Sequence, residues 1–97
     1  MRILGIDYGA KRVGLAISSP VGFIAQGLPT IERIDGMDYL EEIADVINEK
    51  EVNEIVIGLP KNMNGSIGEK AEEVLALVET LKSKFNLPVH TFDERLT

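Results

Sequence analysis

Residues 2–8 read Arg2-Ile3-Leu4-Gly5-Ile6-Asp7-Tyr8, and the prediction of the fold starts from this segment. It is apolar on both faces until it reaches the carboxylate, which is typical of a central strand that ends at an exposed edge of a sheet. After a turn at residues 9–11, apolar and small side chains alternate from Val13 to Ser18, so a second, antiparallel strand follows directly. Phe23 to Ile31 offers a third strand, and the first third of the chain is therefore predicted to be a β-meander.

Two amphipathic helices are predicted further along the chain. Asp35 is expected to cap the first helix, which ends near Lys50. Its apolar positions recur at helical spacing: Met37, Leu40, Ile43, Ala44 and Ile47. Ser66 and Glu69 form a capping box at the start of the second helix. The apolar stripe of that helix comprises Ala71, Val74, Leu75, Val78, Leu81 and Phe85.

Two more strands complete the predicted order of elements. Glu54 to Pro60 is a continuous apolar run closed by glycine and proline, the pattern of a strand that is buried on both faces. Pro88 to Glu94 forms the last strand. The order β-β-β-α-β-α-β predicts an α/β fold with a mixed five-stranded sheet, in which three antiparallel strands are followed by two parallel strands, with flanking helices.

The domain organisation follows from length and composition. We expect residues 1–97 to form a single domain, because 44% of the residues are apolar and no linker is visible. The chain stops just after a strand, where an α/β chain normally enters another helix that covers its sheet. We therefore expect the C-terminal helix to be missing and the domain to be truncated at its C-terminus.

Charge and residue usage exclude several classes of protein. The net charge of −6 argues against binding nucleic acid by bulk electrostatics, so any such contact must be local. The chain has no cysteine, which excludes disulfides, cysteine-ligated zinc and a cysteine nucleophile. The sequence shows no leader and no long apolar run, so we expect a cytoplasmic protein without membrane contact.

Three predicted loops hold nearly all of the unusual residues: 7–12, 58–65 and 93–95. Sites in open α/β sheets form beyond the carboxyl ends of parallel strands, where these loops would converge. With strands about 4.8 Å apart, the backbones of Asp7 and Glu94 would lie roughly 10 Å from each other, close enough for both carboxylates to reach one cation. Hard oxygen ligands favour Mg²⁺ or Mn²⁺. From spacing alone, a turn-capping or ion-pairing role for either carboxylate stays open.

The same loops supply basic and small residues. The candidate phosphate contacts are Lys11, Arg12, Lys61 and Arg95. The glycines at 9, 58 and 65 are interpreted as turn residues that also let a backbone approach a ligand. Asn64 is interpreted as a turn or cap residue rather than a catalytic one. Tyr8 is left open between a core position and a base-stacking one, and His90 is interpreted as a packing or surface residue.

Three blocks of sequence also stand out together: residues 7–16, Gly58-Leu59-Pro60 followed by Asn64-Gly65-Ser66, and Asp93-Glu94-Arg95-Leu96-Thr97. In this order and at these separations they resemble the signature blocks of the YqgF/RuvX family. The resemblance implies an RNase H-like fold related to the Holliday junction resolvase RuvC. It further implies a metal-dependent nuclease that processes the 5′ end of precursor 16S rRNA, with resolution of branched DNA junctions as the alternative activity.

The resemblance also assigns roles to residues. Asp7 matches the catalytic aspartate of the first strand and Glu94 the acidic residue of the fifth-strand block, while Lys11, Arg12 and Arg95 match basic positions of the family. The chain departs from the family at its end, because members continue into a further helix that carries another catalytic aspartate. Without that carboxylate, the resemblance implies weak metal binding and low activity. We expect a monomer or a weak dimer.

Two other classes of function remain open from the sequence. An actin-like or sugar-kinase ATPase also begins with an aspartate and a glycine after its first strand, as in Asp7-Tyr8-Gly9. Such enzymes, however, close a cleft between two domains of this kind. This chain has a single domain and no Walker-type phosphate loop. The other alternative is a non-catalytic module that binds structured RNA or a protein, which the acidic charge and the missing carboxylate would allow.

Overall fold

The computed structural model describes residues 2–18, 25–34, 38–61 and 64–93 of the chain. The elements within these ranges are β1 (Ile3–Tyr8), β2 (Arg12–Ser18), β3 (Ala25–Glu32), α1 (Tyr39–Glu49), β4 (Glu54–Leu59), α2 (Glu69–Phe85) and β5 (Val89–Asp93). The predicted order of elements is confirmed. In the described part of the chain, no helix is long and apolar enough to cross a membrane.

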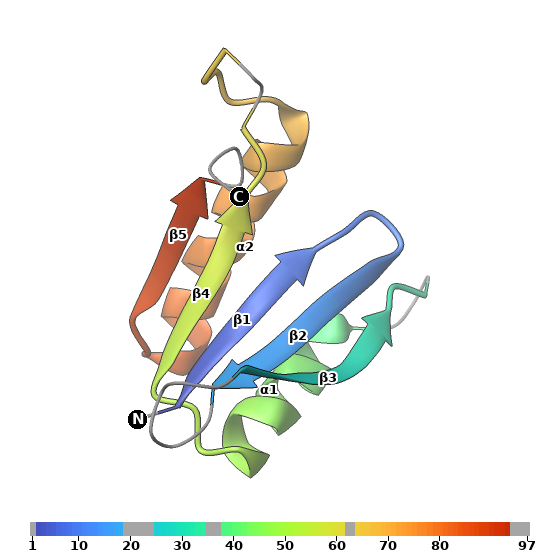
Figure 1. The fold of residues 1–97 in the computed structure, drawn as a ribbon, viewed down its shortest axis with the longest axis vertical. Coiled ribbons are helices and arrows are strands. Elements are labelled where there is room, and N and C mark those ends of the chain that lie inside the picture. The colour runs from blue at the N-terminus through green and yellow to red at the C-terminus, as the bar shows by residue number, and fades with distance from the viewer. Residues whose placement is uncertain (1, 19–24, 35–37, 62–63, 94–97) are drawn as a thin grey trace.

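The five strands form one mixed sheet in the order β3-β2-β1-β4-β5 (Figure 1). β1 pairs antiparallel with β2, and β2 pairs antiparallel with β3. β1 also pairs in parallel with β4, and β4 pairs in parallel with β5. The predicted sheet of three antiparallel strands followed by two parallel strands is thus confirmed, and β1 lies at its centre.

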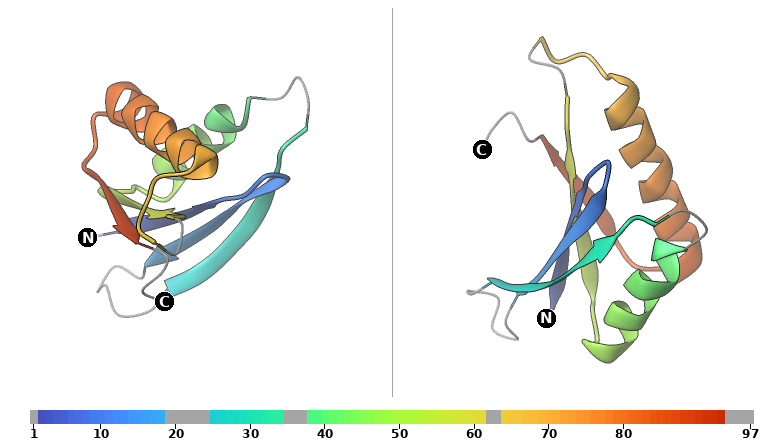
Figure 2. Two further views of the ribbon diagram at one scale, coloured as in Figure 1. Left: turned by 90° about the horizontal axis from the view of Figure 1, so that it is seen from above. Right: turned by 90° about the vertical axis from the view of Figure 1, so that its right-hand side faces the viewer.

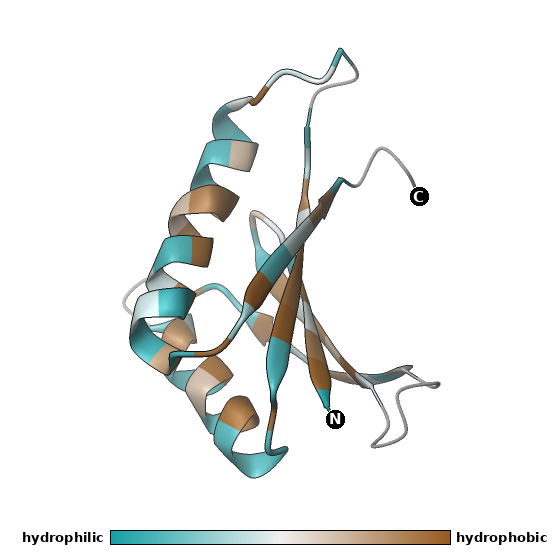
Figure 3. Cartoon of the chain, turned by 90° about the vertical axis from the view of Figure 1, so that its left-hand side faces the viewer, coloured by the Kyte–Doolittle hydropathy of each residue, from teal (hydrophilic) through white to brown (hydrophobic). Residues whose placement is uncertain are grey.

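Both helices lie on the same face of this sheet (Figure 2). Each is joined to a flanking strand by a short connection and lays its apolar side on the central strands. Figure 3 shows hydrophobic residues in the central strands and in the helices that face them. The fully buried large side chains come from both layers: Leu4, Val13, Ile43, Ile55, Ile57, Val74 and Leu81. The core is therefore a single layer of aliphatic side chains between the helices and the sheet.

The start of α1 differs from the sequence prediction. The N-cap is Asp38, whose side-chain Oδ1 accepts a hydrogen bond of 2.9 Å from the backbone N–H of Leu40. The predicted cap at Asp35 is therefore wrong, and both Asp35 and Met37 lie outside the described residues. Both aspartates suit an N-cap, and the choice of Asp38 brings Tyr39 against the ring of Tyr8 at the very start of the helix.

The start of α2 also differs from the prediction. The helix begins at Glu69 after Gly68, which caps it without any side-chain hydrogen bond. The predicted capping box is wrong because Ser66 is engaged in a tight turn instead. Its backbone N–H and its hydroxyl both donate to Oδ1 of Asn64, at 3.0 Å and 2.7 Å. An asparagine that forms such a turn competes with a nearby serine cap for the same hydroxyl.

The buried stripe of α2 is displaced to one side of the predicted one. Leu75, predicted to face the core, is 39% exposed, whereas Leu77, which was not predicted, is 5% exposed. The other predicted positions are buried or partly buried against the core. Leu75 and Leu77 lie on opposite sides of the apolar stripe of α2, so helical spacing suits either of them for burial. The packing of the helix on the sheet determines which of the two is buried.

Leu81 and Leu75 offer a direct test of this placement of α2. Leu81 is 0% exposed, so Leu81→Ala is expected to lower the free energy of unfolding by about 2–5 kcal/mol through the cavity it leaves. The same change at Leu75 is expected to cost less than about 1 kcal/mol, because its side chain is 39% exposed and leaves no enclosed cavity when it is shortened. Urea unfolding followed by circular dichroism measures both values. Equal losses would contradict the orientation of the helix.

Candidate functional site

The carboxyl ends of β1, β4 and β5 lie at one edge of the sheet (Figure 1). The parallel register pairs Ile6 with Ile57 and Gly58 with Phe92, so the three strands reach this edge at nearly the same level. The ends of β1 and β4 therefore lie next to each other at this edge. This convergence is the arrangement that the sequence predicted for a site.

Asp7 is the penultimate residue of β1 at this edge. Leu4 and Ile6 point into the helix-covered core, so alternation along the strand puts Asp7 on the opposite face of the sheet, where it is exposed. Its partner on β2 is Gly14, and the next step of the β1–β4 register brings it beside Gly58. Glycine thus flanks Asp7 on both neighbouring strands. Among the described residues, none forms a hydrogen bond or an ion pair with its carboxylate.

The turn after β1 is held in one conformation by several hydrogen bonds. The N–H of Gly9 donates to the carbonyl of Arg12 at 3.0 Å, and a Cβ at Gly9 would lie 2.7 Å from that same oxygen. From the end of β3, the N–H of Arg33 donates to the carbonyl of Lys11 at 2.9 Å, and its Nη1 donates to the carbonyl of Gly9 at 2.6 Å. The side chains of Lys11 and Arg12 remain exposed on this fixed turn.

Arg33 also joins two tyrosines behind the turn. Its guanidinium carbon lies 4.6 Å from the ring centre of Tyr8 and 5.8 Å from that of Tyr39. The two rings are 5.8 Å apart, and the hydroxyl of Tyr39 donates to that of Tyr8 at 3.5 Å. Tyr8 is therefore half-buried against a cation, and it helps to fix the turn beside Asp7.

This role of Arg33 was not predicted from the sequence. The contact depends on the pairing of Arg12 with Glu32, which places residue 33 beside the β1–β2 turn. That pairing follows a register irregularity between Val13 and Leu15, which alternation of apolar residues does not reveal. One signal in the sequence could have suggested the contact. Arg33 comes directly after a predicted strand, and Tyr8 offers an aromatic ring at the end of the first strand of the same sheet.

The environment of Tyr39 shifts its acidity. Burial raises the pKa of the Tyr39 phenol to about 12, with a further contribution from its hydrogen bond to Tyr8, while the charge of Arg33 acts in the opposite direction. A raised pKa of a phenol means that the folded chain resists its ionisation. The ring of Tyr39 thus stays uncharged well above neutral pH.

The loop after β4 brings the second predicted block to the same edge. Gly58 is buried within β4, and Lys61 lies two residues after the end of the strand with its side chain half-buried. Asn64 and Gly65 form the turn before α2, where Gly65 has a φ of 88° that favours glycine. The side chain of Asn64 is used within that turn, in agreement with its interpretation as a turn residue.

The last block lies at the end of β5. Glu94 and Arg95 lie outside the described residues, so their predicted positions remain predictions. His90 is 59% exposed with its Nε2 3.4 Å from Oε2 of Glu54, which confirms its interpretation as a surface residue. An exposed carboxylate such as Asp7 suits a hard cation by its chemistry, but no group of three potential ligands occurs within the described ranges.

Comparison with known proteins agrees with this arrangement. The whole chain, residues 1–97, matches the sequence profile of the family described as RuvX, Holliday junction resolvase. The chain belongs to the RuvX family. One RuvX relative, from Clostridium acetobutylicum, is 50% identical over 97 residues, which are 100% of this chain and 72% of the relative. That relative carries the provisional name pre-16S rRNA nuclease.

Solved structures show the same fold. Thermus thermophilus RuvC in complex with a Holliday junction substrate superposes with a TM-score of 0.65 at 16% identity, over 98% of the RuvX chain and 66% of RuvC. A ROK family protein from Streptococcus pneumoniae in complex with sucrose gives a TM-score of 0.66 at 27% identity, over 96% of this chain and 34% of that protein. The predicted RNase H-like fold is thereby confirmed.

Gly9 provides a test of the turn that presents Lys11 and Arg12. Gly9→Ala would press a methyl group against the carbonyl of Arg12, and it is expected to lower the free energy of unfolding by about 1–3 kcal/mol. Gly27→Ala on β3 is the matched control, because no atom lies within 4 Å of the added carbon, and its effect is expected to stay within about 0.5 kcal/mol. Thermal unfolding compares the two variants, and similar melting temperatures would contradict the close approach at Gly9.

Tyr39 makes the stability depend on alkaline pH. Its pKa is raised from 10.0 to about 12 in the folded chain, so the unfolded chain releases this proton first. The resulting stability is fully present below pH 10.0 and is lost as the pH rises through about 12. Absorbance of the tyrosinate band is expected to show a component with that midpoint, which Tyr39→Phe removes. A full tyrosinate signal near the ordinary pKa would contradict the buried hydrogen-bonded phenol.

Proposed function

We propose that this chain is a metal-dependent nuclease that hydrolyses phosphodiester bonds at the 5′ end of precursor 16S rRNA. The observation that carries the proposal is the exposed carboxylate of Asp7 at the carboxyl edge of the central strands, which lies between Gly14 and Gly58 and binds no other side chain in the described ranges. A carboxylate with glycine on either side leaves room for a bulky, charged polymer. The names of the RuvX relatives supply the substrate class.

In this proposal Asp7 and Glu94 hold Mg²⁺ or Mn²⁺. Carboxylate oxygens are the ligands these hard cations prefer, and a bound ion would activate water and stabilise charge on the phosphodiester. The role of Asp7 is to fix the ion at the end of β1, which lies between β2 and β4 in the sheet. The role of Glu94 rests on its place in the sequence directly after β5 and on its match to the acidic residue of the family's fifth-strand block.

Basic side chains around the carboxylate would hold the RNA backbone. Lys11 and Arg12 are exposed on the fixed turn, Lys61 follows β4, and Arg95 follows Glu94 in the sequence. Because the chain carries a net charge of −6, we expect these few local contacts to dominate phosphate binding. The turn that Arg33 pins would keep two of the four cations in place before RNA binds, which reduces the entropy lost on binding.

Resolution of branched DNA junctions is the second candidate, because the description of the family names it. A resolvase makes two symmetric cuts and needs a dimer, so a strict monomer in solution would count against this candidate. The sugar-kinase alternative is weaker, since the ROK family protein matches over 34% of its length while the RuvX profile covers the whole chain. A precursor rRNA substrate would place the protein in the cytoplasm.

The test is Mg²⁺- or Mn²⁺-dependent cleavage of a labelled precursor 16S rRNA and of a four-way DNA junction. Asp7→Asn removes a metal ligand but keeps the size of the side chain, and it is expected to lower the cleavage rate at least about 100-fold. Asp45→Asn, the same change on α1, is the matched control and is expected to leave the rate unchanged. The relative from Clostridium acetobutylicum, assayed in parallel, shows that the substrate is competent.

The outcomes separate the candidates. Cleavage of the rRNA that Asp7→Asn abolishes supports the proposal, and preferential cleavage of the junction supports the resolvase. If the relative cleaves while this chain only binds RNA in the presence of chelator, the chain is a non-catalytic binding module and the proposal is wrong. Equal activity of Asp7→Asn and the unaltered chain would also refute the role of Asp7.

A further inference from the structure

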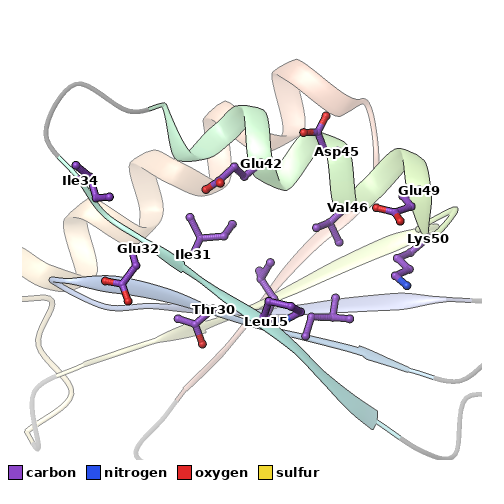
Figure 4. A pocket seen from close by; sticks show the side chains of 12 residues that line it. Leu15, Thr30, Ile31, Glu32, Ile34, Glu42, Asp45, Val46, Glu49 and Lys50 are labelled. Atoms are coloured by element: carbon purple, nitrogen blue, oxygen red, sulfur yellow. The ribbon is translucent and has the colours of Figure 1, made fainter.

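A second surface lies away from the Asp7 edge, between α1 and the outer strand β3. The two elements enclose a groove of about 670 Å³ (Figure 4). Its volume falls within the range of about 300–1,000 Å³ that is typical of ligand sites. β3 is an edge strand of the sheet, and it bounds one side of the groove.

The floor of this α1–β3 groove is apolar. Figure 4 shows Leu15, Ile31 and Val46 between the helix and the strand. Leu28 lines the groove from β3, and Ile34 lies at its end with 57% of its surface exposed. Ile34 is the most exposed of the large hydrophobic residues within the described ranges. An apolar groove with an isoleucine left in water is suited to receive apolar side chains from a partner.

The rim of the groove is acidic on the helix side. Glu42, Asp45 and Glu49 line it from α1 and are spaced by three and four residues, which puts them on one face of the helix. Over these seven residues the helix rises about 10 Å, so the carboxylates form a short row parallel to the groove. Glu32 also lines the groove from β3, but its carboxylate points away from α1 (Figure 4). Lys50 is the one basic residue in the described lining.

We infer that this groove binds a positively charged amphipathic helix of a partner protein. The apolar side of such a helix would fill the floor formed by Ile31, Val46 and Ile34. Lysine or arginine residues spaced by three and four along it would pair with the row of carboxylates on α1, since both helices have the same rise per residue. The charge of the rim determines the partner's charge, and the apolar floor determines its amphipathic pattern.

Other occupants fit the groove less well. Nucleic acid would bring phosphates against the three carboxylates of α1. A second copy related by two-fold symmetry would bring the same acidic row against itself. An added β-strand would meet Pro29 in the middle of β3, and proline offers no N–H for strand pairing. The surface is independent of the proposed nuclease activity, because none of its lining residues belongs to the Asp7 edge.

The experiment uses a fluorescein-labelled, end-blocked peptide as the probe. It is designed as a helix with leucine along one face and lysine beside that face, and fluorescence anisotropy measures its binding to the chain at physiological salt. Two control peptides have the same length: one has the same composition in an order without an apolar face, and the other carries glutamate in place of lysine. The lysine helix is expected to bind, and both controls are expected to bind at least about tenfold more weakly.

Matched variants locate the binding surface. Glu42→Lys with Asp45→Lys reverses the rim and is expected to weaken binding at least about tenfold, whereas Glu72→Lys with Glu73→Lys makes the same change of net charge on the exposed side of α2 and is expected to leave binding nearly unchanged. Ile34→Ser is expected to weaken binding about threefold to tenfold by removing an apolar contact. Circular dichroism confirms that each variant retains its helices.

Several results would overturn the inference. Equal weakening by the α1 and α2 variants would mean that the peptide follows overall charge and has no defined site. Equal binding of the reordered peptide would remove the need for an apolar floor. A dimer that forms with rising concentration, and in which α1 and β3 show the amide shift changes by NMR, would make a second copy the occupant. Amide shifts confined to α1 and β3 on addition of the lysine helix would support the inference.

Discussion

The parallel pairing of β1 with β4 connects the β-meander to the parallel half of the sheet and builds the centre of the core. Leu4 lies beside Ile55 and Ile6 beside Ile57, and all four side chains are buried against the helices. Because β1 is antiparallel to β2 on its other side, this one strand joins the two halves of the sheet. The same register that buries these side chains brings the end of β1 level with the ends of β4 and β5. Core and candidate site thus arise from one set of contacts.

The strands and their order could be predicted from the sequence because buried strands and turns leave strong local patterns. The run from Glu54 to Pro60 and the alternation after Val13 each determined a strand without knowledge of its neighbours. The helix starts could not be predicted as well, because Asp35 and Asp38 both suit a cap, and Asn64 competes for the hydroxyl of Ser66. Such competitions are decided by tertiary contacts that local sequence does not encode.

In the candidate site, too, some residues could be predicted from local sequence and others depend on tertiary contacts. Asp7 could be singled out because a carboxylate at the end of an apolar strand is conspicuous, and its exposure at the sheet edge agrees with that interpretation. Arg33 could not, because its contacts with Gly9 and Tyr8 depend on the irregular pairing of β2 with β3. The structure also divides the charge of the chain between surfaces, with Lys11 and Arg12 on the β1–β2 turn and the acidic row on α1.

The contiguity of the meander bears on how the chain reaches its native state. β1, β2 and β3 follow one another directly, so their pairing closes short loops, whereas Leu4 and Ile55 lie roughly 50 positions apart. Loop-closure entropy rises with the length of chain enclosed, and distant pairings therefore tend to form late. We expect the meander to assemble first and to offer the bare edge of β1 as a template for β4. Pulse-labelled hydrogen exchange during refolding would reveal this order through earlier protection of amides in β2 than in β5.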